Sequence, residues 1–225
     1  MKKLLCYFIG CFIVVLANAQ DDIVINLDSI KNIKSTRYSS INEVGVGINV
    51  GGKLIQKFPN NTQKRTLGID KPDFIFRTVH GALINPKLFI GAGLGIDFRP
   101  NGNYGSRYFY FTFPIFAEFR EYFLDGNFNL FVSQRIGGAF YLDSYFNNSI
   151  NKGRYSGAFG EFMLGGRYVT NGKKLAVHFG VGYRLQHLQR KVDIQDLNGN
   201  AGQTYNNVPE ITIKHYVPIT IGITY

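Results

Sequence analysis

The sequence has few features that would stabilise the protein covalently. It contains no tryptophan, and its only two cysteines are Cys6 and Cys11. Both lie within residues 1–19, where a basic start, an apolar run over residues 4–16 and a small-residue site form the pattern of a secretory signal peptide cleaved before Gln20. The exported chain would then carry no thiol, which excludes disulfides and cysteine chemistry.

Long hydrophobic runs and acidic residues are also scarce. No segment after residue 19 has 18 consecutive apolar residues, so the pattern disfavours a helical membrane protein. Only 15 residues are Asp or Glu against 25 Lys and Arg, which gives a formal net charge of +10. For an exported chain, this balance favours anionic lipid headgroups or lipopolysaccharide as partners and disfavours nucleic acid.

Aromatic residues and glycine are plentiful, with 20 Phe, 14 Tyr and 26 Gly, a composition typical of β-structure. Apolar residues alternate with small or polar ones, the period of a β-strand with one apolar face. In KLFIGAGLGIDF, for example, the even-numbered apolar residues share one face, and the glycines share the other with Asp97. Eight such strands are predicted, over residues 41–51, 73–84, 88–98, 107–122, 128–142, 156–169, 174–188 and 211–225.

The connections between these strands alternate in length. Tight links follow the second, fourth and sixth strands, and longer polar loops at 52–72, 99–106, 143–155 and 189–210 follow the others. This pattern predicts an all-β fold, an eight-stranded antiparallel up-and-down transmembrane β-barrel, located in a bacterial outer membrane after signal-peptide-directed export. A soluble β-sandwich or a closed periplasmic barrel is the alternative, in which the apolar faces would pack a protein core.

Three regions are therefore expected along the chain. Residues 1–19 are the signal peptide, residues 20–40 are a periplasmic N-terminal segment that is either a short strand or disordered, and residues 41–225 are the barrel. Pro114 and Pro218 fall inside predicted strands. Because proline donates no backbone hydrogen bond, we expect a bulge or a missing hydrogen bond at each.

Two long stretches carry a family resemblance. The runs TVHGALINPKLFIGAGLGIDF and FTFPIFAEFREYF, together with the aromatic last residue, resemble the small outer-membrane β-barrel proteins of the Bacteroidetes type, the OmpX-like and PorT-like group. The resemblance covers most of residues 41–225 and implies an eight-stranded barrel. It also implies that Ile221, Ile223 and Tyr225 form a C-terminal signal read by the outer-membrane assembly machinery.

Charged residues recur on the strand faces opposite the apolar sets. In such a barrel, these opposite faces point into the lumen. They are four acids and six bases: Glu43, Arg77, Asp97, Glu118, Arg120, Arg135, Glu161, Arg167, Arg184 and Lys214. One interpretation is an ion-selective path or a buried relay. The other, which we favour, is a charge network that fills the lumen and neutralises itself, because unpaired buried charge is costly.

No catalytic or metal site is predicted, and no cofactor. The four histidines lie on different segments without metal-ligand spacing. A lipid-modifying enzyme would need Ser, His and a carboxylate near the membrane surface, and His187 has Asp193, Asp196, Ser144 and Ser149 in neighbouring loops. Nothing in their spacing assembles these residues into a triad.

The loops are the better place for function. The first holds the basic residues Lys53, Lys57, Lys64, Arg65 and Lys71, which suit phosphate or carboxylate groups of surface glycolipid, although a solvated basic loop is an equal interpretation. The sequence thus predicts a monomeric, non-catalytic outer-membrane barrel acting in membrane structure or surface interaction. A narrow channel, a subunit of a secretion or assembly machine with a protein partner that the sequence does not identify, and a lipid-modifying enzyme are the alternatives.

Overall fold

The computed structural model describes residues 36–59, 61–69, 72–100, 109–123, 126–143, 155–170, 175–195 and 204–225. The predicted signal peptide at 1–19 lies outside these residues. Every regular element among these residues is a β-strand: β1 (Arg37–Lys57), β2 (Thr62–Leu67), β3 (Asp73–Asn85), β4 (Leu88–Pro100), β5 (Phe109–Phe123), β6 (Phe128–Asp143), β7 (Tyr155–Val169), β8 (Ala176–Gln195) and β9 (Thr204–Thr224). In the part of the chain so described, there is no helix of sufficient length and apolarity to cross a membrane.

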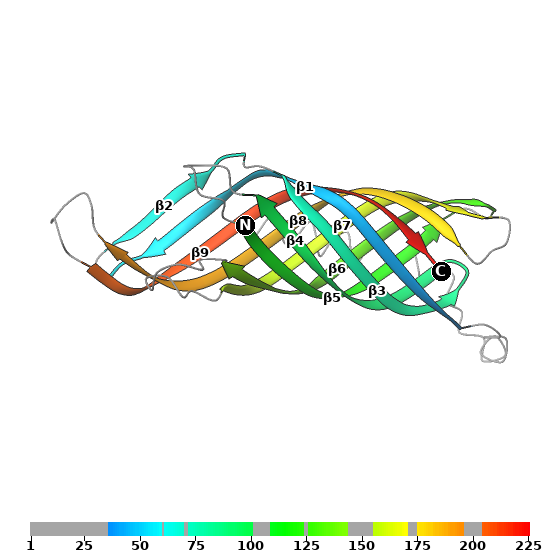
Figure 1. Ribbon diagram of the computed structural model, residues 1–225, viewed down its shortest axis with the longest axis horizontal. Coiled ribbons are helices and arrows are strands. Elements are labelled where there is room, and N and C mark those ends of the chain that lie inside the picture. The colour runs from blue at the N-terminus through cyan, green and yellow to red at the C-terminus, as the bar shows by residue number, and fades with distance from the viewer. Residues whose placement is uncertain are drawn as a thin grey trace, which may run out of the picture. The chain divides into compact units, whose positions relative to one another are not determined.

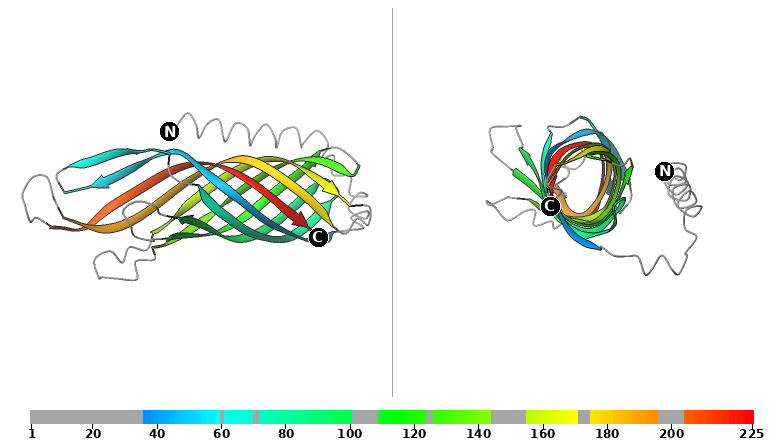
Figure 2. Two further views of the ribbon diagram at one scale, coloured as in Figure 1. Left: turned by 45° about the horizontal axis from the view of Figure 1, so that its top comes forward. Right: turned by 90° about the vertical axis from the view of Figure 1, so that its right-hand side faces the viewer.

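Eight of these strands close into a barrel (Figures 1 and 2). Each of β3 to β9 pairs antiparallel with its neighbour in the chain, β1 pairs with β3, and β9 returns to pair with β1. At the seam, the Ser40 amide donates to the Tyr225 carbonyl and the Tyr225 amide donates to the Ser40 carbonyl, at 2.8 and 3.0 Å. The predicted eight-stranded antiparallel up-and-down barrel is confirmed.

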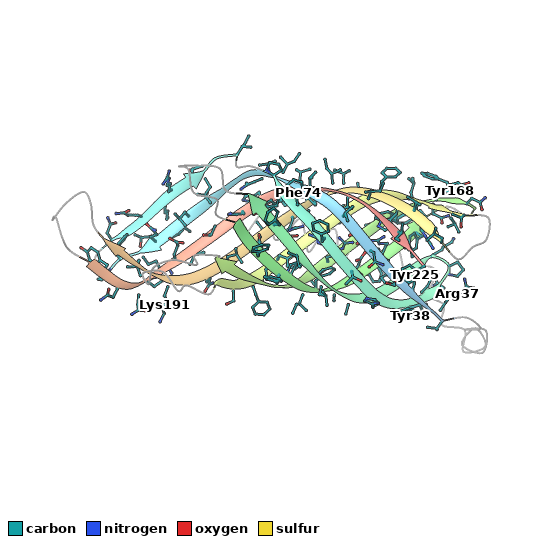
Figure 3. The ribbon with its side chains drawn as sticks, viewed as in Figure 1. Arg37, Tyr38, Phe74, Tyr168, Lys191 and Tyr225 are labelled. Carbon is teal, nitrogen blue, oxygen red and sulfur yellow. The ribbon has the colours of Figure 1, made fainter. Side chains whose placement is uncertain are left out.

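Side chains in this barrel are arranged inside out relative to a soluble protein. Large apolar side chains such as Leu94, Ile136 and Phe179 are 58%, 73% and 60% exposed on the outer face. Figure 3 shows labelled members of the outer set, Phe74 and Tyr168, pointing away from the ribbon. Charged side chains are buried in the lumen instead. An apolar outer band around a polar interior is the pattern of a transmembrane barrel, because only lipid makes such a surface favourable.

The first barrel strand begins earlier than predicted. It starts at Arg37, so residues 37–40, which the sequence pattern placed in the N-terminal segment, belong to the barrel wall. These four residues have only a short, polar alternation. They form a strand because they pair with His80 to Leu83 on β3 and because Ser40 pairs with Tyr225.

Two of the predicted loops were wrong. The loop at 52–72 contains the end of β1 and all of β2, paired from Gly52–Leu67 to Lys57–Thr62. The loop at 189–210 is mostly the extended ends of β8 and β9, which pair as far as Gln195–Thr204. These segments are mostly polar and lack a long apolar alternation, so the sequence pattern predicted loops. We call β2, β1 from Gly52, and the paired ends of β8 and β9 the projecting sheet; it extends past the other strands in Figure 1. The opposite end, which holds Pro86, Lys87 and Tyr225, is the turn end.

A bulge changes the facing of β1 where it enters the projecting sheet. The pairing with β9 shifts between Asn49 and Gly51. Gly51 has φ of +143°, a conformation that favours glycine, and its amide donates to the Asn49 side-chain oxygen at 2.9 Å. Even-numbered residues of β1 such as Val44 face outward below the bulge, and odd-numbered residues such as Lys53 face outward above it.

Pro114 and Pro218, the two prolines predicted to disturb their strands, each interrupt the pairing with one neighbouring strand without shifting the register. β4 and β5 pair at Leu94–Ile115 and again at Asp97–Thr112, and the pairs around Pro114 are absent. β8 and β9 likewise pair at Val181–Ile219 and at Arg184–Tyr216, on either side of Pro218. The predicted loss of a ladder hydrogen bond fits both sites, and neither forms a bulge.

Candidate functional site in the lumen and on the projecting sheet

The lumen contains a row of alternating charge that the strand register creates. Glu118 of β5 lies opposite Arg135 of β6, Arg135 opposite Glu161 of β7, and Glu161 opposite Arg184 of β8. All four side chains are buried. Directly opposed residues on adjacent strands have neighbouring side chains, so each charge lies beside one of opposite sign.

Arg135 is the centre of this network. Its Nη2 contacts Glu43 at 2.7 Å, its Nε contacts Glu118 Oε2 at 3.0 Å, and its Nη1 contacts Glu161 Oε1 at 3.0 Å. These three acids come from β1, β5 and β7, so a single guanidinium joins distant parts of the wall. Arg120 supports two of the same acids, with its Nη2 at 2.8 Å from Glu43 and 2.6 Å from Glu118.

Glu161 is the corresponding anionic centre. Besides Arg135, it accepts from Arg77 Nη1 at 2.5 Å and from Arg184 Nε at 2.7 Å. Arg184 also donates from Nη1 to Asp97 at 2.5 Å, which adds β4 to the network. Four acids and four arginines are thereby connected in a water-excluded lumen, and their formal charges balance.

A ninth member of the network, His178 of β8, was not predicted. This side chain is fully buried, with Nε2 at 3.1 Å from Glu43 and Nδ1 at 3.4 Å from the Thr224 hydroxyl of β9. Every barrel strand therefore contributes to the network. The sequence did contain a signal for this position, because His178 lies six residues before Arg184 on the same inward face. The histidines were considered as metal ligands, however, and not as members of the charge network.

Two predicted members lie apart from the network. Arg167 sits nearer the turn end, 4.6 Å above the Tyr122 ring. Lys214 lies on β9 within the projecting sheet, opposite Gly52 and Gln186. The structure thus brings together eight of the ten residues that the sequence marked for the lumen.

Aromatic and aliphatic side chains are also buried inside the barrel, and some of the rings lie against the guanidinium groups. The Arg120 guanidinium lies 4.5 Å from the Phe131 ring centre, and Arg77 and Arg135 lie 5.7 and 5.5 Å from that of Phe116. Stacked rings stabilise buried guanidinium groups whose N–H groups exceed the available acceptors. An eight-stranded barrel is only wide enough for side chains, so this packing closes the lumen.

A closed lumen predicts no conductance. We expect the purified protein in planar bilayers to give no single-channel steps, because any path crosses the ion-paired layer around Arg135. Steps that change ion selectivity in a Glu118→Gln or Arg120→Gln variant would contradict this and would favour the channel alternative.

The projecting sheet has a basic outer face. Lys53, Lys57 and Lys64 are exposed there, grouped around Ile55, which pairs directly with Lys64. Diagonal neighbours on such a sheet are about 7–8 Å apart at Cα. Lys191 of β8, which is labelled in Figure 3, adds a further exposed cation on the outward side of its strand, opposite Pro209. We call Lys53, Lys57, Lys64 and Lys191 the lysine face.

Other residues of the predicted basic loop are placed differently. Arg65 pairs with Leu54 and therefore points to the opposite face of β2. Lys71 lies outside the described residues. Glu210, an acid of this sheet whose side chain is described, is buried on the inner face and accepts from Gln56 Nε2 at 2.8 Å, so it does not neutralise the lysine face.

The residues weighed for lipid-modifying chemistry are not joined by this structure. His187 faces outward on β8, opposite Ile213. Ser144, Ser149 and Asp196 lie outside the described residues, as does the side chain of Asp193. Within the residues described, no cluster of three His, Cys, Asp or Glu side chains is positioned to hold a metal ion.

Eight antiparallel strands closed around a polar lumen, with an apolar outer band, define a transmembrane β-barrel of the outer-membrane type. No protein-family model and no curated protein matches the chain. Among solved structures, it is similar to the outer membrane protein OprG from Pseudomonas aeruginosa, with 12% identity, a TM-score of 0.53, and coverage of 86% of this chain and 98% of that one. At that identity the likeness extends to the fold alone.

Two further structures match over most of their length. Neisserial surface protein A is 12% identical, with 81% of this chain and 95% of that chain covered and a TM-score of 0.43. The outer membrane protease OmpT from Escherichia coli is 10% identical, with 86% and 99% covered and a TM-score of 0.42. With scores this low, neither supports an inference about the activity of this chain.

Proposed function

We propose that the protein is a non-catalytic, monomeric outer-membrane barrel that binds anionic groups of the surface glycolipid through its lysine face. The observation that carries this proposal is the gathering of Lys53, Lys57 and Lys64 on the outer face of the projecting sheet. That face continues the lipid-facing side of the barrel, so its cations lie beside the membrane and not above the lumen.

The position of the lysine face along the barrel, just beyond the apolar band, supports a glycolipid as the ligand. On β1 the outward residues change from Val44 and Ile48 to Lys53 within a few positions, and on β8 they change from Phe179 and Val181 to Lys191. Cations that follow an apolar band meet the headgroup region of the lipid. With the projecting sheet at the cell surface, those headgroups are the phosphates and carboxylates of lipopolysaccharide.

The test compares a triple variant, Lys53→Gln, Lys57→Gln and Lys64→Gln, with the unmodified protein in binding of purified lipopolysaccharide. Each cation near anionic headgroups contributes about 1 kcal/mol, so the loss of three is expected to weaken binding on the order of 100-fold. Because these contacts are between exposed charges, the difference should shrink as salt is raised.

Arg65→Gln is the matched control, since Arg65 lies on the same strand as Lys64 but on the opposite face. It should leave binding within about twofold. An equal loss per charge in Arg65→Gln would mean that net charge and not the lysine face attracts the lipid, and unchanged binding in the triple variant would refute the proposal.

Two finer assignments accompany this function. The motifs around residues 78–98 and 111–123 support membership of the Bacteroidetes-type group of small barrels. Ile221, Ile223 and Tyr225 are 54%, 43% and 57% exposed on the outer face of β9, which supports their use as an assembly signal, since the assembly machinery must reach side chains that are not packed inside.

A further inference from the structure

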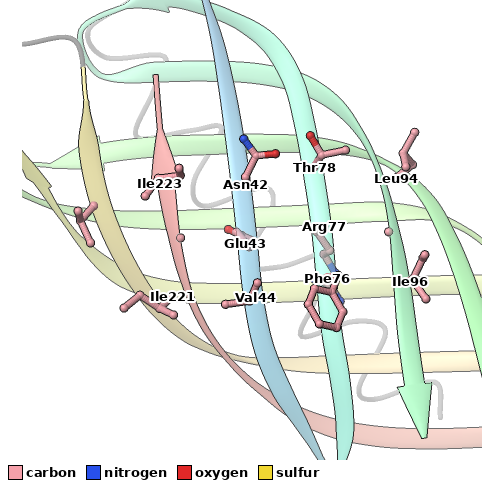
Figure 4. Close-up of a pocket in the computed structure, with 13 residues that line it drawn as sticks. Asn42, Glu43, Val44, Phe76, Arg77, Thr78, Leu94, Ile96, Ile221 and Ile223 are labelled. Carbon is pink, nitrogen blue, oxygen red and sulfur yellow. The ribbon is translucent and has the colours of Figure 1, made fainter.

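A shallow apolar depression lies on the outer surface of the barrel, at the seam where β1 lies between β3 and β9 (Figure 4). Phe76 and Leu94 flank it on β3 and β4, and Ile221 and Ile223 flank it on β9. Val44 of β1 lies between them, opposite Phe76 and Ile221. This depression is part of the lipid-facing band, so hydrocarbon is the material that fills it.

A polar cluster interrupts the apolar band next to the depression, toward the turn end. Asn42 lies opposite Thr78 at the edge of the depression (Figure 4). Beyond them, His80 is bonded through Nε2 to the Thr78 hydroxyl at 3.0 Å and through Nδ1 to the Tyr38 hydroxyl at 2.6 Å. The rings of Tyr38 and His80 are stacked with centres 6.2 Å apart. On the flanking strand β4, the outward residues Ile90 and Leu94 remain apolar.

The two hydrogen bonds of His80 use the proton of only one of its two hydroxyl partners. A neutral imidazole has one N–H and one lone pair, so one of its two hydroxyl partners donates to the ring and the other accepts. The hydroxyl that accepts, whether on Tyr38 or Thr78, retains its own proton. With either tautomer, the cluster therefore presents an O–H that can donate to a ligand.

Charge at this end of the seam suits an anion. The exposed charged side chains of β1 and the β3–β4 turn here are Arg37 and Lys87, both cationic, and Arg37 points to the lumen side of β1 because it is odd-numbered. The acids of β1, β3 and β4, which are Glu43, Asp73 and Asp97, are all buried. Glu121, an acid with some exposure along this rim, lies one strand further, on β5 opposite Leu88, and the Tyr225 carboxylate accepts from the Ser40 amide at the seam.

We propose that this seam holds one glycerophospholipid molecule. Its acyl chain lies in the depression beside Val44 and Phe76, and its ester and phosphate oxygens accept hydrogen bonds from Asn42, the Tyr38–His80–Thr78 cluster and Lys87 of the β3–β4 turn. Along the strands, the apolar groove is followed by the hydroxyl donors and then by the cation. The parts of the lipid come in the matching order: acyl chain, glycerol ester, phosphate. The site is separate from the lysine face and does not depend on the function proposed for it.

Native mass spectrometry of the full-length protein released from detergent micelles tests this inference, with phosphatidylglycerol as the probe lipid. One bound phospholipid is expected on the unmodified protein. Val44→Phe fills the depression and Thr78→Val replaces a hydroxyl with a methyl group of the same size, and each should lower the lipid-bound fraction at least tenfold. Both positions face lipid, so the heat-dependent gel mobility of the barrel should be unchanged.

Ile136→Phe on β6 is the matched control, because it adds the same ring to the lipid-facing band at a distant, highly exposed position. It should retain the phospholipid. Unchanged retention in both seam variants, or equal loss in Ile136→Phe, would show only general lipid coating and overturn the proposal. Equal retention of lipopolysaccharide, or full displacement of the lipid by glycerol phosphate alone, would overturn the assignment to a phospholipid held by its chain.

Discussion

Replacing Phe179 with arginine is expected to prevent most of the protein from assembling as a folded barrel. Phe179 is 60% exposed on β8, between the outward residues Val177 and Val181, near the middle of the apolar band. An arginine on the lipid face near the bilayer midplane costs about 2–4 kcal/mol. The loss is measured as the fraction of the chain with folded, heat-sensitive mobility on unboiled gels after refolding into lipid vesicles.

Gln189→Arg provides the control for this substitution. Gln189 is exposed on the same strand and the same outer face, but it lies in the projecting sheet, beyond the apolar band. It should leave the folded fraction unchanged. In a soluble β-protein an exposed Phe179→Arg would change stability by no more than about 0.5 kcal/mol. Equal folding of the two variants would therefore contradict a membrane-spanning barrel.

The second large effect is expected at the centre of the lumen. Arg135→Met removes the guanidinium that contacts Glu43, Glu118 and Glu161, whose side chains are fully inaccessible to solvent. Breaking a buried ion pair by removing one partner costs about 3–5 kcal/mol, because the remaining charge has no solvent to stabilise it. We expect the unfolding midpoint of the barrel in urea to fall accordingly, with the folded protein reduced to a minor fraction under mild conditions.

Two further variants separate loss of charge balance from loss of volume. Arg167→Met removes a lumen arginine that stacks on Tyr122 and makes no ion pair within the described part of the chain, so it should destabilise the barrel much less. Adding Glu118→Gln to Arg135→Met removes one charge of each sign and should recover part of the lost stability. If Arg167→Met costs as much as Arg135→Met, packing and not the ion network stabilises the lumen.

The barrel fold was predictable because its information is local. Alternation with period two marks the lipid-facing side of each strand, and residues such as Leu94, Ile115 and Ile221 are exposed on that side as expected. Short turns that alternate with long connections then determine an even, up-and-down strand order. The projecting sheet was not predicted because most of its residues are polar and its few apolar residues form no long regular alternation, so the sequence offers little hydrophobic period to detect.

The lysine face shows how one backbone feature alters such a prediction. Counting along β1 from Val44, alternation assigns odd-numbered Lys53 and Lys57 to the lumen side. The bulge at Gly51 inserts one extra residue and reverses the facing of everything beyond it. A sequence of glycines and valines does not reveal which residue the partner strand skips. The basic residues were therefore predicted to lie in a loop, without a prediction of the face on which they lie.

By itself, the sequence determined that this chain forms a closed barrel, which residues meet lipid and which charges enter the lumen, because each of these depends on neighbours within a strand. Only the tertiary structure decided which charges meet. The contacts of Glu43 with Arg135 and His178 join residues 92 and 135 positions apart. Such contacts depend on strand register and closure of the barrel, and no local pattern in the sequence encodes the distance between side chains that approach one another across a lumen.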